Sequence, residues 1–80
     1  MDIQAAIRSR QHEQRELRCR YAHAAERKWE LRTRMLPPEK EAIRRKIIKR
    51  YELECKAMVE QINELGEEIY KLQMKERESE

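Results

Sequence analysis

The sequence predicts an all-α protein: an antiparallel two-helix hairpin of coiled-coil type, completed by dimerisation into a four-helix bundle. Of its 80 residues, 44% are charged and 39% are hydrophobic, and the chain has one glycine and no phenylalanine. Ordinary globular chains carry roughly 25% charged residues, so this composition favours long, surface-rich helices over a sheet. Glycine and proline are absent from residues 2–34, and Gly66 is the only helix breaker in residues 39–80. The third observation is a heptad repeat in the second half of the chain.

The first helix is expected over about residues 2–35, with Asp2 as its N-cap. A break is expected at residues 36–38, because Pro37 disfavours a helical conformation at Leu36. Pro38 lacks a backbone donor but fits the first turn of a new helix, which we expect to run to about residue 77. The whole chain, 1–80, is then one helical hairpin without further domains.

The second helix carries an uninterrupted apolar seam with alternating spacings of three and four residues. These are the a and d positions of a heptad, which we call the seam and interpret as the self-association surface. Ile47 and Val59 at the flanking positions widen the stripe, and the flanks carry no opposite charges that would select a parallel partner. A wider stripe is typical of a bundle. The seam comprises Ile48, Tyr51, Cys55, Met58, Ile62, Leu65, Ile69 and Leu72.

The apolar stripe of the first helix is poorer, because Arg10, Gln14 and Lys28 interrupt it. Buried polar groups are costly, so these side chains are expected either to reach the edge of the core or to meet a polar partner. A two-helix hairpin forms a single layer and cannot surround its own apolar stripe. We therefore expect a homodimer, or a hairpin completed by a different protein.

Charge is distributed unevenly along the chain. The net charge is +3, but residues 1–50 carry a net charge of +8 and residues 51–80 a net charge of −5. No apolar run approaches the ~20 residues that span a bilayer, and the N-terminal residues do not form a signal peptide. The expected location is therefore cytoplasmic, without a membrane partner.

Folding at the prolines places residues 27–50 at one end of the rod, which we call the tip. This segment carries ten basic and three acidic residues. One interpretation is a phosphate-binding surface for nucleic acid, with Trp29 stacking on a base. The other is a surface that meets an acidic protein, where opposite charge speeds association. In both cases the predicted contact residues are Trp29, Arg32, Arg44, Arg45, Lys46 and Arg50.

No pattern in the chain indicates catalysis, a cofactor or a metal site. Ser9 and Ser79 lie near the ends of the chain without a credible base, and no glycine-rich phosphate loop is present. Cys19 and His23 lie four residues apart, but one helix supplies an incomplete zinc shell. If the chain folds back at residue 37, Cys19 and Cys55 lie at the same height along the hairpin. However, Cys55 lies in the seam and Cys19 points away from the apolar stripe of the first helix, so a disulfide is not expected and both thiols should be free.

The function that these features favour is that of a non-catalytic helical interaction protein, such as a small regulator, adaptor or inhibitor. It would contact another protein through an extended helical face and also associate with itself. The alternative is a small nucleic-acid-binding protein that uses the basic tip. Charge reversal at Arg44, Arg45 and Lys46 would discriminate the two, because it should weaken only nucleic-acid binding.

Overall fold

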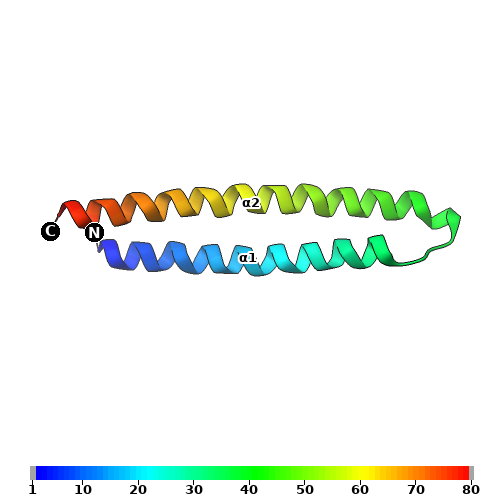
Figure 1. Ribbon diagram of the computed structural model, residues 1–80, viewed down its shortest axis with the longest axis horizontal. Coiled ribbons are helices and arrows are strands. Elements are labelled where there is room, and N and C mark those ends of the chain that lie inside the picture. The colour runs from blue at the N-terminus through cyan, green and yellow to red at the C-terminus, as the bar shows by residue number, and fades with distance from the viewer. Residues whose placement is uncertain (1, 80) are drawn as a thin grey trace.

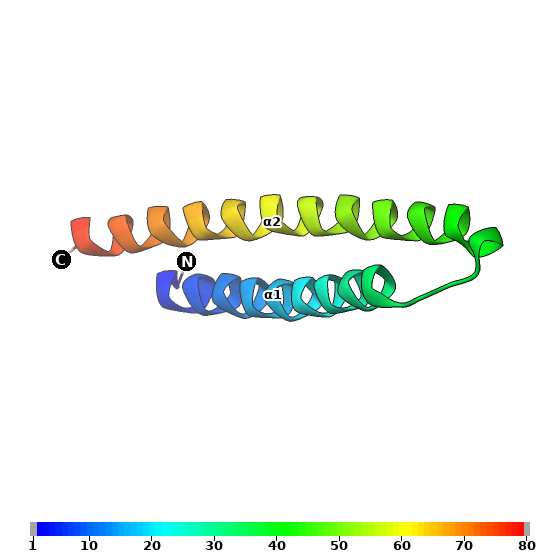
Figure 2. The ribbon, with the colours of Figure 1, turned by 45° about the vertical axis from the view of Figure 1, so that its right-hand side comes forward.

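A computed structural model describes residues 2–79 as two long antiparallel helices that lie side by side (Figures 1 and 2). Helix α1 spans Ile3–Thr33, a short 3₁₀ helix η1 spans Pro38–Lys40, and α2 spans Glu41–Glu78. No strand occurs within residues 2–79. The hairpin is rod-shaped, and its Cα atoms extend over 64 × 16 × 14 Å along the three principal axes. The predicted helical hairpin is confirmed.

Helix α1 begins as predicted and ends two residues earlier than predicted. The Asp2 carboxylate accepts a hydrogen bond of 3.0 Å from the backbone N–H of Gln4, which is the expected N-cap. At the other end, Arg34 is already extended, with a ψ of 128°. Helix axes pack 8–10 Å apart and an extended residue covers about 3.3 Å, so residues 34–37 are needed to cross between the helices.

The turn uses both prolines in the way their chemistry requires. Pro37 is extended, and Pro38 occupies the first position of η1. A backbone N–H at this position would have no acceptor within the helix, so proline loses no hydrogen bond there. The N–H of Lys40 donates to the Pro37 carbonyl at 3.0 Å, and the chain passes directly into α2. Helix α2 therefore begins at Glu41, three residues later than predicted, because a tighter turn precedes it.

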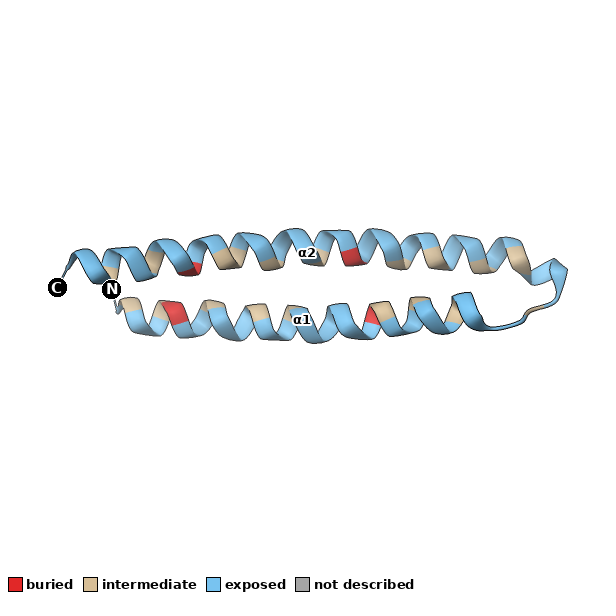
Figure 3. Ribbon diagram, in the orientation of Figure 1, coloured by how far each residue is buried: buried red, intermediate tan, exposed pale blue. Residues whose placement is uncertain are grey.

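Burial follows the heptad repeat along both helices, as Figure 3 shows for their facing sides. Four residues form the buried core: Ile7 and Ala24 on α1, and Cys55 and Ile69 on α2. The other six seam residues are half-buried. The seam packs on α1 of the same chain, whereas the sequence had suggested that it needs a second copy. Six of the eight seam residues keep part of their surface open, so self-association through the seam stays a prediction.

The polar residues that interrupt the α1 stripe explain how this helix covers the seam. Arg10 Nε lies 3.0 Å from Glu68 Oε2, and Gln14 Nε2 donates to the Ile62 carbonyl at 3.1 Å. Their long side chains thus reach polar atoms of α2 while their stems stay in the interface. Arg10 and Gln14 combine the two expected arrangements, since they reach the edge of the core and find a polar partner in α2. Lys28 is half-buried and makes no ion pair with a described side chain.

These cross-helix contacts also correct the predicted register. The Arg10–Glu68 and Gln4–Glu76 pairs have their midpoints at residues 39 and 40 rather than 37. This difference moves the residue opposite Cys19 by more than one helical turn, so Cys19 is not level with Cys55. The longer connection between the helices is the cause. Both thiols are free, with Cys19 exposed and Cys55 buried, as expected for an exposed thiol and a small apolar core residue.

Gly66 marks the point where the Gln14 side chain lies against α2. A Cβ atom at residue 66 would lie 3.4 Å from Gln14 Nε2, and nothing else would approach it within 4 Å. The missing side chain leaves room for Gln14 to reach the Ile62 carbonyl, one turn earlier in the same helix. Gly66 therefore serves the helix–helix contact, although one methyl group would still fit.

Replacing Gly66 with alanine is expected to raise the free energy of unfolding by up to about 1 kcal/mol, the difference in helix propensity. Gly66→Leu should be about 1 kcal/mol less stable than Gly66→Ala, because its larger side chain displaces Gln14 and removes one hydrogen bond. Urea denaturation followed by circular dichroism measures both. Equal stability of the two variants would show that the Gln14 contact contributes nothing.

Candidate interaction surfaces

Of the six predicted contact residues at the tip, Arg44 is used inside the hairpin. Its Nη1 donates to the carbonyl oxygens of Arg34 at 2.8 Å and Leu31 at 3.5 Å, and its Nη2 pairs with Glu41. The side chain is only 19% exposed. Leu31 has one of the carbonyls that the end of α1 leaves unpaired, so this cation stabilises the helix terminus. Arg44 is thus a structural residue of the turn.

The other five predicted contact residues are exposed, but they do not form one patch. Trp29, Arg32 and Arg45 occupy heptad positions b and e, Arg50 occupies position c, and Lys46 occupies position f. Arg32 pairs with Glu52, and Arg50 Nε lies 3.7 Å from Glu54 Oε1. The tip is therefore basic on several sides, and part of its charge is already neutralised by neighbouring carboxylates.

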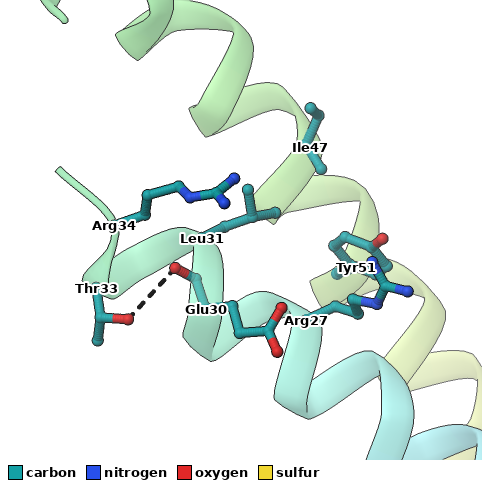
Figure 4. Close-up of a pocket in the computed structure, with 7 residues that line it drawn as sticks. All are labelled: Arg27, Glu30, Leu31, Thr33, Arg34, Ile47 and Tyr51. Carbon is teal, nitrogen blue, oxygen red and sulfur yellow. Dashed lines mark hydrogen bonds between the residues drawn. The ribbon is translucent and has the colours of Figure 1, made fainter. Parts of the chain in front are cut away.

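A groove lies between the helices next to the tip (Figure 4). Arg27, Leu31 and Arg34 line it from the first half of the chain, and Ile47 and Tyr51 line it from α2. Its lining combines apolar side chains with two arginines. Glu30 and Thr33 also line the groove, and the Thr33 hydroxyl donates to the Glu30 carbonyl at 3.3 Å.

The two broad sides of the rod differ in charge, and we name them by heptad position. In an antiparallel pair, the e positions of both helices lie on one side and the g positions on the other, as the Arg32–Glu52 contact shows. We call the side with positions g and c the mixed face. It includes the tip groove and a second groove lined by residues such as Glu13, Arg20 and Glu64. Its helical carboxylates are Glu13, Glu16, Glu30, Glu54, Glu64, Glu68 and Glu78.

The side with positions e and b is strongly positive, and we call it the basic face. It carries eight cations and a single carboxylate, Glu52, which is paired with Arg32. Trp29 and Tyr70 lie on this face with exposed fractions of 66% and 63%. Gln11 and Gln73 line a groove on it, together with Glu76, a residue at position a whose carboxylate pairs with Gln4. The eight cations, all exposed, are Arg8, Arg15, Arg18, Arg32, Arg45, Lys49, Lys56 and Arg77.

The basic face was missed at the level of sequence because charge was counted in consecutive blocks. The acidic second half of the chain hides Lys56 and Arg77, and the count at the tip omits Arg8, Arg15 and Arg18. The signal that finds the face is the heptad itself: sorting the charges by positions e and b, once the antiparallel pairing is known, separates them.

The described residues give no structural basis for a metal centre or a membrane span. Within residues 2–79, no group of three or more His, Cys, Asp or Glu side chains is placed to hold a metal ion. His12 Nε2 instead lies 3.1 Å from Glu16 Oε1, and Cys19 is an exposed free thiol. No helix in this range combines the length and apolar character needed to cross a bilayer.

Comparisons with protein-family models, with curated proteins and with solved structures find no match to this chain. The features of this chain that bear on function are the two faces of the hairpin and the apolar side chains that it leaves exposed.

Proposed function

We propose that this chain is a non-catalytic helical interaction protein, a small regulator, adaptor or inhibitor, that forms a homodimer and binds a macromolecular partner through an extended face. The observation that carries the proposal is an incomplete core. Only four of residues 2–79 are buried, while large apolar side chains, among them Ile43 and Ile47, remain exposed. A chain of this size gains stability by associating, and a second layer of two helices would complete a four-helix bundle.

The mixed face is the side that suits self-association. A two-fold dimer places the same surface of each copy against itself. On the basic face this arrangement would oppose eight cations to eight cations, with one carboxylate on each side, which is strongly unfavourable. The mixed face carries both signs of charge and the exposed apolar side chains of Ile43 and Ile47. Charge therefore selects the mixed face for the second copy.

The arrangement of charge on the mixed face supports an antiparallel dimer. Arg27 and Arg34 line the groove near the tip, whereas Glu13, Glu64 and Glu68 line the groove nearer the termini. A two-fold axis perpendicular to the rod would place the cationic groove of each copy against the acidic groove of the other. Complementary charge of this kind sets the orientation of the partners more than their affinity.

The double substitution Ile43→Asp with Ile47→Asp is expected to convert the dimer to a monomer, because it places two carboxylates in the apolar part of the proposed interface. Sedimentation equilibrium at micromolar concentration measures the change. The matched control is Leu53→Asp with Met74→Asp, at position f, the side of α2 that faces away from α1. These residues are 62% and 36% exposed, against 60% and 37% for the first pair, and the control should stay dimeric.

A wild-type protein that sediments as a monomer at micromolar concentration would contradict the dimer. A dimer that survives both interface substitutions, or a control that dissociates equally, would contradict the assignment of the mixed face as its interface. Circular dichroism shows whether each variant is still helical, so that dissociation is not confused with unfolding.

A further inference from the structure

Most cations of the basic face are not paired with a carboxylate of residues 2–79. Six of its eight cations make no ion pair with another described side chain, and only Arg32 and Arg45 of the eight pair with a carboxylate in residues 2–79. At 1.5 Å per helical residue, the cations extend over about 36 Å of α1 and about 48 Å of α2. The positive charge therefore runs along much of the rod and matches a long anionic partner better than a compact ligand.

The neutral side chains of this face favour nucleic acid over an anionic membrane. Binding in a membrane interface requires a continuous apolar stripe opposite the charges. The uncharged positions here are instead filled by alanines, amides, Gly66, a single exposed aliphatic side chain, Val59, and two exposed aromatic rings, Trp29 and Tyr70. Cations that follow a phosphate backbone, combined with aromatic rings on which bases stack, are the common elements of single-strand recognition.

The width of the rod argues against reading the grooves of a duplex. The major groove of B-DNA, about 12 Å wide, accommodates one helix. The Cα atoms of this hairpin alone extend 16 and 14 Å across the rod, before side chains are added. A duplex could touch the basic face only through its outer phosphates, and Trp29 and Tyr70 would then have no base within reach.

We infer that the basic face binds single-stranded nucleic acid without strong sequence preference, with its cations on the phosphates and Trp29 and Tyr70 stacking on bases. The inference rests on the proposed function, since it names the partner class of the interaction protein. It moves the predicted contact from the tip to the side of the rod. It also leaves the mixed face free for the second copy.

The test is a titration of the dimeric protein with an oligodeoxythymidylate of about 15 nucleotides, near the upper end of single-strand site sizes. Trp29 is the only tryptophan, so quenching of its fluorescence reports stacking directly. We expect binding at low salt that weakens as salt rises, with a slope of roughly −0.7 for each phosphate contacted. Duplex of the same length, heparin and anionic vesicles serve as competitors and should bind more weakly.

A pair of matched variants separates the basic face from total charge. The first variant replaces Arg8, Lys49 and Lys56 with glutamine, and the second replaces Lys46, Arg50 and Lys75, which lie off the basic face and line neither groove of the mixed face. Each loses one arginine and two lysines. The first should bind at least about tenfold more weakly, with a salt slope reduced by up to about 2, and the second should bind within about threefold of wild type.

Trp29→Ala is expected to weaken binding by at least about fivefold, whereas Trp29→Phe should retain most of the affinity, because phenylalanine keeps a ring for stacking. Equal losses in the two charge variants would overturn the inference, as would unchanged affinity in Trp29→Ala. It would also fail if duplex, heparin or vesicles competed as well as the single strand. Sedimentation of the same samples distinguishes the proposals, since a stable dimer without nucleic-acid binding refutes only this one.

Discussion

Replacing Ile69 with alanine is expected to lower the free energy of unfolding by about 2 to 3 kcal/mol. Loss of a buried isoleucine side chain costs 2–5 kcal/mol, and the lower end applies here because water can enter at the edges of a two-helix interface. Ile69, with 8% exposure, is one of only four buried residues in the part of the chain that the structure describes. Small domains are stable by roughly 0.05–0.15 kcal/mol per residue, so this single change removes a large fraction of the total.

Urea denaturation followed by circular dichroism measures this effect, and the midpoint should fall by about 1 to 2 M. The matched control is Leu53→Ala in the same helix. The Leu53 side chain is 62% exposed and lies outside the buried core. Its effect should stay within about 0.5 kcal/mol. Similar losses at both residues would mean that α2 does not pack on α1 through the seam.

The second large effect is expected at Arg44. Arg44→Ala removes the hydrogen bonds to the Leu31 and Arg34 carbonyls and the ion pair with Glu41. Hydrogen bonds from a charged group contribute about 1.5–3 kcal/mol, and the lost cation also leaves the negative end of α1 uncompensated. We expect a loss of about 2 kcal/mol in stability. Hydrogen exchange should be fastest at the last turn of α1 and in residues 34–40.

Arg45→Ala is the control for this prediction. Its side chain is 79% exposed, and its Nε lies 3.7 Å from Glu41 Oε1, a surface ion pair that contributes little. A change below about 0.5 kcal/mol is expected, and equal destabilisation by the two alanines would refute the role given to Arg44. One practical consequence concerns charge reversal at the tip. A variant that includes Arg44 would disturb the hairpin itself, so binding experiments should leave this residue unchanged.

The two helices and the place of their connection are predictable from the sequence. The heptad spacing of the seam, the N-cap at Asp2 and the two prolines predict two helices with a turn near residues 36–38. These features act through neighbours within one or two helical turns, so local patterns are sufficient to find them. The helix ends moved by only a few residues, because the distance between packed helices sets how many extended residues the connection needs.

Three features depend on how the helices pack: which residues cover the seam, which cations form ion pairs, and how charge is distributed between the basic face and the mixed face. The seam packs on α1, and Arg10 and Gln14 of α1 donate hydrogen bonds to α2 across the interface. The apolar pattern of α1 did not predict these bonds. Arg44 and Arg45 are adjacent in sequence, yet one stabilises the end of α1 and the other faces water. Such differences depend on register and on contacts between residues far apart in the chain. A count of residue types along the sequence contains neither.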